Sequence, residues 1–542
     1  MAKRKSVSFD LRVQELFSLD LRSLALFRIT FGLLILSDLV VRATFLQAHY
    51  TDFGVLPRIP LIEQFNSPWR VSLHYMSGLW QIQALLFALQ AVLAVMFLIG
   101  YRTRLATFFS WVMMVSLHYR NPMVLQAGDF LFRMLLFWGM FLPLNARGSV
   151  DSVLEPPQSR LPERVFSMAT VALFAQIGFV YWFTSAFKLS PESFPIWWEK
   201  ATAVHNALSI DQFTRPFGYF LLQFPHLLKF LSRAVICFEI LGPLLLISPF
   251  FTEVVRTIGV LSFWFLHLGF GLCMSLGPFP WISSIAMIPF LPTLVWENLE
   301  KVFKKWNFNF RLESLQKGIA PKVSLLPKPA GSIRLSLSKP GILLVSLSLI
   351  YVFFWNLGTL QPRWDIPRRL RWIGILTGLE QRWNMFSPPL TEDGWYVIPG
   401  ILRNGDIVDL FKEGGPLTWQ KPIPVSRTYA NERWRKYMMN LWIKTNAPHR
   451  LYYGKYLCRN WNAHHQGDLE LQKFQIYYVR EKTLPDGRRE EPRKILLWKH
   501  WCFKTPEEVT KLSANIESKM ETLPSKSNAG EKTKKARFFL RG

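Results

Sequence analysis

Apolar stretches long enough to cross a lipid bilayer recur along most of this 542-residue chain, from about Leu24 to Leu360. Short connections that are charged or rich in proline separate them. A spanning helix needs about 20 predominantly apolar residues. Because lipid offers the backbone no hydrogen-bonding partner, recurring stretches of this length are best explained as transmembrane helices. The sequence therefore predicts a polytopic membrane protein.

The apolar stretches divide into about nine predicted transmembrane helices. Their approximate ranges are 24–42, 79–100, 104–119, 126–145, 165–187, 230–250, 256–276, 279–296 and 341–360. The expected fold is an all-α polytopic membrane domain over residues 22–360, which follows a cytoplasmic segment, 1–21. A smaller α+β extracytoplasmic domain is expected over 361–521, and a basic flexible tail over 522–542.

The formal net charge of +27 has two possible explanations. Nucleic-acid binding is one. Loop lysines and arginines beside anionic lipid headgroups are the simpler explanation, and we prefer it because half of the residues are apolar. The expected partners are therefore the lipid bilayer and an exported protein or peptide substrate, with no nucleic acid.

Basic residues indicate the orientation, because lysine and arginine are enriched in cytoplasmic loops. Lys3, Arg4 and Lys5 precede the first span, which predicts a cytoplasmic N-terminus. The connection 297–340 contains nine basic and three acidic residues. Nine alternating spans place this connection in the cytoplasm as well, so the C-terminal domain is expected outside the cell membrane.

The C-terminal domain carries signals for strands and for a helix. Segments 395–401, 472–480 and 494–503 are rich in aromatic and β-branched residues, and Asp-Gly turn chemistry falls within 484–488. Helical spacing runs through 431–445. We expect a small antiparallel sheet. Cys458 and Cys502 lie in this domain and could form a disulfide if it is outside the cytosol.

Ionisable residues within predicted spans are expensive in lipid and need an explanation. They fall into three pairs: Arg28 and Asp38, Asp129 and Arg133, and Arg233 and Glu239. Ion pairing that fixes helix packing is the simpler interpretation for each pair. A polar cavity at membrane depth is the functional one.

Lys188 is the sharper candidate, because it ends a largely apolar span and an aromatic-rich connection follows, 194–200. Such a lysine commonly extends to the headgroups. The alternative is an amine in an apolar pocket formed by residues such as Tyr181 and Trp182, where burial disfavours the ammonium form and leaves a neutral amine that can accept a proton.

His267 lies in the middle of a predicted span. A lone histidine on an apolar face is usually a hydrogen-bonded packing residue, but it could orient a quinone-type ligand. The four cysteines fit no metal-binding pattern, and no metal site is predicted. The sequence contains no phosphate-binding glycine loop, HExxH motif or nucleophile elbow, which argues against nucleotide hydrolysis, zinc proteolysis and esterase activity.

Several motifs occur in an order that resembles the HTTM domain, the horizontally transferred transmembrane domain shared with vitamin K-dependent γ-glutamyl carboxylase. They are FRITFGLLILSDLVVRA (27–43), HYTDFGVLPR (49–58), HYRNPMVLQAGD (118–129), SAFKL (185–189) and LHLGFGLCMSLGPFP (266–280). The resemblance covers about residues 20–300. The later QRWNMFSPP (381–389), DGWYVIPG (393–400) and NERWRKYMMNL (431–441) are similar to the outer region of bacterial HTTM proteins.

The resemblance implies a reaction. In the carboxylase, a lysine deprotonates reduced vitamin K, a naphthoquinone, and O2 addition generates a strong base. That base removes a γ-proton from a protein glutamate, and CO2 adds to the carbanion. Lys188 in SAFKL matches the lysine, and His267 matches a family histidine; both are expected to be catalytic. The quinol pocket is expected to include the following residues: Asn121, Asp129, Arg133, Tyr181 and Trp182.

One position departs from the carboxylase pattern. The carboxylase has a histidine directly after the asparagine that matches Asn121, and here that position is Pro122. A non-catalytic membrane module that binds or matures an exported protein therefore stands beside the carboxylase-like lyase as an alternative function. Transport is a third, although the sequence shows no paired inverted repeats or broken-helix glycine pattern.

Overall fold

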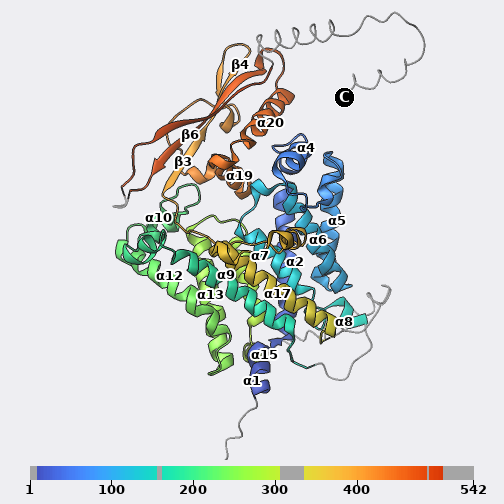
Figure 1. Ribbon diagram of the computed structural model, residues 1–542. Coiled ribbons are helices and arrows are strands. Elements are labelled where there is room, and N and C mark those ends of the chain that lie inside the picture. The colour runs from blue at the N-terminus through green and yellow to red at the C-terminus, as the bar shows by residue number, and fades with distance from the viewer. Residues whose placement is uncertain (1–8, 155–161, 306–334, 485–487, 504–542) are drawn as a thin grey trace, which may run out of the picture.

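The computed structural model describes residues 9–154, 162–305, 335–484 and 488–503. Long helices form a bundle, and a β-sheet with flanking helices forms a C-terminal domain at one end of it (Figure 1). Helix α1 (Phe9–Phe17) lies at the opposite end of the bundle (Figure 1). The chain is thus mostly helical, with the sheet confined to the C-terminal region.

Each predicted span coincides, wholly or in part, with a helix. These helices are α2 (Leu21–Ala43), α5 (Trp80–Ile99), α6 (Thr103–Arg120), α7 (Ala127–Gly139), α9 (Met168–Lys188), α12 (Pro225–Leu246), α13 (Thr252–Cys273), α14 (Phe279–Met287) with α15 (Thr293–Lys305), and α17 (Lys339–Leu360).

Five of the described helices are long and apolar enough to cross a membrane: α2, α5, α9, α13 and α17. The number rises to six if α14 and α15, which are bent by 91° relative to each other, count as one span. Helix α7 has only 13 residues, too few to cross the hydrocarbon core alone, and α12 carries Lys229, Arg233 and Glu239. The structure therefore supports a multi-pass membrane protein, but it does not confirm nine spans.

The outer surface of these helices is apolar. Leu85 and Val92 of α5 are exposed, as are Leu343 and Leu347 of α17. Water-soluble domains rarely expose apolar surface over such lengths. These faces suit contact with lipid chains.

Arg28 is one of the charged residues within the predicted spans, and its side chain lies between α2 and the end of α5. Arg28 of α2 donates hydrogen bonds to the carbonyl oxygens of Leu144, at 3.0 Å, and of Gly148. Gly100 ends α5 in the left-handed region, with φ +72°, and any side chain there would collide with the Arg28 guanidinium. Backbone carbonyls, not Asp38, are therefore the hydrogen-bond partners of Arg28.

The C-terminal sheet is antiparallel. Its strands are β3 (Glu392–Val397), β4 (Pro399–Leu402), β5 (Ile407–Asp409), β6 (Leu471–Lys482) and β7 (Arg493–Trp501). β3 and β4 pair in succession with one edge of β6, β7 pairs with its other edge, and β5 pairs with β4. Helices α19 (Glu432–Trp442) and α20 (His449–His464) flank the sheet (Figure 1).

The expected strands and helix of this domain are present at the predicted positions, whereas α20 and β5 were not predicted. Three predictions lie largely or wholly outside the described residues: the Asp-Gly turn, which includes residues 485–487; the basic connection, of which 306–334 are not described; and the tail over 522–542.

The bundle and the C-terminal domain share one hydrophobic core. Residues of the bundle's connections pack among the sheet and helices of the C-terminal domain, namely Val55, Leu56, Leu61, Met123 and Val124. The junction is therefore packed, so the C-terminal domain is held in a defined position.

Cys458 of α20 and Cys502, next to β7, form a disulfide with their Cα atoms 5.4 Å apart. The bond ties α20 to the edge of the sheet across 44 residues of chain. The sequence left this pairing open, and the structure shows it.

Replacing both cysteines with serine should lower the free energy of unfolding of the C-terminal domain by about 4 kcal/mol, because a loop of this length loses its closure constraint. The measurement is the urea midpoint for proteolysis of this domain in detergent. Cys237→Ser, at an exposed free cysteine, is the matched control and should leave the midpoint unchanged. Equal midpoints for all three proteins would contradict the prediction.

Candidate functional site

Lys188 is the last residue of α9, and its side chain is buried, with 3% exposed. Its Nζ lies 2.5 Å from Oε1 of Glu239 on α12, which is also buried. The ammonium group lies 4.2 Å from the ring centroid of Trp197. The lysine therefore points into the protein, and the interpretation that it extends to the headgroups is wrong.

The connection after α9 closes over this pair. A π-helical turn, η4 (Pro195–Glu199), brings Trp197 against Lys188. Trp197 Nε1 donates to the carbonyl oxygen of Phe386, at 2.9 Å. A segment that precedes the sheet thus holds the indole in place, and an aromatic ring takes the position that water would occupy beside the amine.

A second polar pair involves Tyr181, which lies earlier on α9. The hydroxyl of Tyr181 lies 2.6 Å from Nε2 of His267, on α13, and both side chains are buried. Tyr181 precedes Lys188 by seven residues, which is about two helical turns, so the two side chains share one face of α9. Glu239 is close enough to Tyr181 for an electrostatic interaction.

Two buried atoms of this site have no hydrogen-bond partner among the described residues. They are Oε2 of Glu239 and Nδ1 of His267. A buried polar atom without a partner is costly, and it often marks a position where a ligand or water completes the bonding. We call the pairs Lys188–Glu239 and Tyr181–His267 together the amine site.

Trp182 contributes to this region differently. It is only half-buried, and its Nε1 donates to the carbonyl oxygen of Ile240, at 3.0 Å. Ile240 follows Glu239 on α12, so the bond fixes α9 against α12 beside the amine site.

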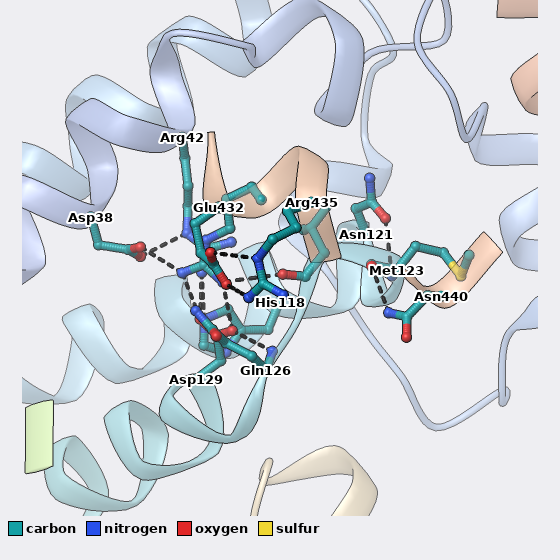
Figure 2. A network of polar contacts seen from close by, with 12 residues as sticks. Asp38, Arg42, His118, Asn121, Met123, Gln126, Asp129, Glu432, Arg435 and Asn440 are labelled. Carbon is teal, nitrogen blue, oxygen red and sulfur yellow. Dashed lines mark hydrogen bonds and ion pairs between the residues drawn. The ribbon is translucent and has the colours of Figure 1, made fainter. Parts of the chain in front are cut away.

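A further buried cluster joins the bundle to the C-terminal domain (Figure 2). Asp38 and Arg42, one turn apart on α2, pair at 2.6 Å, and Arg42 lies 2.5 Å from Asp129 of α7. Arg433 of α19 pairs with Asp38 and with Asp129, at 2.6 Å in both cases. We call these four side chains the junction network.

The junction network is neutral overall, with two carboxylates and two guanidinium groups, and it is fully buried. Arg42 also donates to the hydroxyl of Tyr50, at 2.9 Å, and the backbone N of Gln126 donates to Asp129, at 2.8 Å. Nε2 of His118 lies 3.5 Å from Asp129. Each carboxylate therefore has several partners, which a buried ion pair needs to offset its loss of hydration.

The other predicted pocket residues have structural contacts. Asn121 donates to the carbonyl oxygen of His49, at 3.0 Å, and accepts from the backbone N of Met123. Arg133 donates to the carbonyl oxygen of Glu380, at 3.2 Å. The structure thus brings Tyr181 and His267 together and places Lys188 on the same helix face, whereas Asp129 belongs to the junction network.

The three ion pairs expected from the sequence are all replaced by other contacts. Asp38 and Asp129 bind Arg42 and Arg433, and Glu239 binds Lys188. Arg28, Arg133 and Arg233 donate to backbone carbonyls. The predictions paired residues that are close in sequence. They were wrong because the two members of each pair contact different neighbouring segments in the bundle.

Sequence reasoning missed Arg433 and the pairing of Glu239 with Lys188. Charge balance could have indicated the Arg433 contact. Asp38 and Asp129 both lie in predicted spans, and two buried carboxylates need two cations. The family-like segment 431–441 contains a suitable arginine. No group of three or more His, Cys, Asp or Glu side chains could hold a metal ion in the described ranges.

A family model for the HTTM domain matches residues 18–296, just over half of the chain. The chain belongs to the HTTM domain family. This is the domain shared with vitamin K-dependent γ-glutamyl carboxylase. No curated protein and no solved structure matches the chain. The amine site lies wholly within the HTTM domain, whereas the junction network joins that domain to Arg433 beyond it.

Replacing Arg433 with methionine should lower the free energy of unfolding by about 3–5 kcal/mol, because two buried carboxylates would then share one cation. The thermal midpoint in detergent and the yield of folded protein report the loss. Arg493→Met is the matched control, since the Arg493 side chain is 68% exposed. Similar midpoints for the two variants would show that the network contributes little.

A second polar contact between the HTTM domain and the sheet contains a carboxyl with a shifted pKa. Asp393 of β3 is buried and accepts hydrogen bonds from the backbone N of Asp211 and from Nε2 of Gln212, at 2.8 Å. Burial raises the pKa of Asp393 to about 6. Asp211 itself pairs with Lys421, at 2.5 Å, and with Arg489.

The free energy of unfolding should therefore fall as the pH rises from about 4 to about 6. The reason is that Asp393 binds its proton more tightly in the folded state than in the unfolded chain. The total change should reach about 3 kcal/mol. Asp393→Asn should remove this component, which is read as the thermal midpoint of each protein across that pH range. Parallel pH profiles would rule out the assignment to Asp393.

Proposed function

We propose that this HTTM protein is a membrane enzyme whose chemistry is similar to that of vitamin K-dependent γ-glutamyl carboxylase, with Lys188 as its base. The observation that carries the proposal is the burial of this amine against one carboxylate, Glu239, within the HTTM domain. A lysine that only supported packing would gain more from exposure to headgroups. The burial of Lys188 away from water therefore supports a chemical role for its amine.

The Lys188–Glu239 pair can store and move a proton. Transfer of a proton from the ammonium group to Glu239 leaves both groups neutral, and burial reduces the cost of that transfer. The resulting amine can accept a proton from a weak acid held beside it. Oε2 of Glu239, which has no partner among the described residues, can pass the proton onward.

The amine site suits a reduced naphthoquinone of the vitamin K type. Such a molecule has an aromatic ring with hydroxyl groups on opposite sides. The site offers Lys188, the Nδ1 of His267, which has no partner among the described residues, and the rings of Trp197 and Phe279. Tyr181 holds the His267 ring from the other nitrogen. When bound, the quinol would supply, with O2, the strong base for γ-proton removal from a protein glutamate, to which CO2 then adds.

We also propose that the N-terminus is cytoplasmic and that the C-terminal domain lies outside the cytoplasm. The position of α1 and the C-terminal domain at opposite ends of the bundle supports this orientation (Figure 1). The Cys458–Cys502 disulfide also supports it, since such bonds persist in oxidising compartments. Nine crossings are part of this proposal, and α7, which has only 13 residues, would then need adjoining residues to complete its crossing.

A second candidate function is a non-catalytic module that binds or matures an exported protein. Strand β7 favours it, because no described strand pairs with its outer edge. An extended polypeptide can add to such an edge. The basic side chains of β7, which include Lys494 and Lys499, suit an acidic one.

Replacing Lys188 with alanine should reduce quinol-dependent O2 uptake and CO2 incorporation at least about 100-fold, the usual contribution of a positioned base. The assay uses purified protein, a reduced naphthoquinone and labelled CO2. Lys229→Ala, an exposed lysine of α12, is the matched control and should retain the wild-type rate. Equal rates for the two variants would exclude Lys188 as the base. The second candidate function, a non-catalytic module that binds or matures an exported protein, would then be favoured.

A further inference from the structure

A cavity of about 420 Å³ is lined by residues from 47–58 and 76–80, far along the chain from the amine site. Helix α4 (Arg58–Pro60), which begins with one of these residues, lies at the end of the bundle beside the C-terminal domain (Figure 1). The connection after α2 forms one wall, through Gln47, Asp52 and Arg58. The start of α5 and the residues before it form the other, through Met76, Leu79 and Trp80. The proposed reaction uses none of these residues.

The polar wall of the cavity contains one ion pair, Arg58–Asp52, and a second arginine lies behind it. Arg58 Nε donates to Asp52 Oδ2, at 2.9 Å, and Arg58 Nη1 donates to the carbonyl oxygen of Tyr75, at 3.0 Å. Arg120, fully buried, lies behind Asp52 at 3.9 Å. Two guanidinium groups therefore face one carboxylate, and Nη2 of Arg58 makes no hydrogen bond with a described residue.

The rim of the cavity is apolar and open. Met76, Leu79 and Trp80 are 73%, 64% and 56% exposed. Leu85 and Val92 continue this exposed apolar face along α5, which is one of the candidate spans. The cavity therefore opens where the lipid-facing surface of α5 begins.

The geometry points to a binding site for an anionic phospholipid, with the phosphate of its headgroup against Arg58 and its acyl chains along α5. Charge complementarity selects the headgroup, because the one carboxylate of the wall, Asp52, lies between Arg58 and the buried Arg120, and Nη2 of Arg58 is left to donate to a phosphate oxygen. The apolar face of α5 selects a lipid over a water-soluble anion. A water-soluble anion would leave this apolar face without a partner.

Two features keep the cavity in shape. The backbone N of Asp52 donates to the carbonyl oxygen of Gly78, at 3.0 Å, and any side chain at position 78 would collide with the Asp52 carboxylate. Arg459 of α20 donates to the carbonyl oxygens of Phe53 and Gly54, at 2.9 and 3.1 Å. A lipid bound here would thus contact a connection that supports the C-terminal domain.

The test compares phosphatidylglycerol with phosphatidylcholine of matched acyl chains, titrated into the purified full-length protein and read by native mass spectrometry. We expect retention of one phosphatidylglycerol and weak retention of phosphatidylcholine. Arg58→Gln should weaken phosphatidylglycerol binding about fivefold, as expected for the loss of one arginine–headgroup contact. Arg368→Gln, at an exposed arginine outside the cavity, is the control and should bind as the wild type does.

Leu79→Glu provides a second variant, because it places a negative charge on the rim without touching the Asp52–Arg58 pair. It should also weaken phosphatidylglycerol binding, and it decides the matter if Arg58→Gln fails to fold. Undiminished binding in Leu79→Glu and in any folded Arg58→Gln, or equal retention of the two lipids, would overturn the proposal. Displacement of the lipid by an equal concentration of inorganic phosphate would also overturn it.

Discussion

Charged side chains inside the bundle must find their partners within the protein, because lipid can neither hydrate nor pair them. Arg433 shows what this constraint requires. It comes from α19 of the C-terminal domain and completes the neutralisation of Asp38 and Asp129 on two bundle helices. This contact joins the C-terminal domain to two bundle helices, beside the hydrophobic cluster that the two parts share.

The same constraint separates two kinds of buried charge in this protein. In the junction network every carboxylate has several donors, so the charges are satisfied and the network is structural. In the amine site, Lys188 and Glu239 have each other, while Oε2 of Glu239 and Nδ1 of His267 are left without partners among the described residues. A buried polar atom without a partner often marks a position where a ligand or water completes the bonding.

These two clusters lie on different parts of the scaffold. The amine site uses α9, α12 and α13, whereas the junction network uses α2, α7 and α19. The segment before the sheet still reaches the amine site, because Phe386 accepts the Trp197 hydrogen bond. The C-terminal domain therefore binds one cluster through Arg433, and the segment before the sheet contacts the other through Phe386.

Local patterns in the sequence determined the class of protein, the positions of most helices and the main strands of the sheet, because hydrophobic length and alternation act over a few neighbouring residues. The motifs also identified the HTTM domain and singled out Lys188 and His267. Tertiary structure alone decided which charges meet: Asp38 with Arg433, Asp129 with Arg42, and Lys188 with Glu239. These contacts join residues up to 395 positions apart, and only the packing of whole helices determines which side chains face each other.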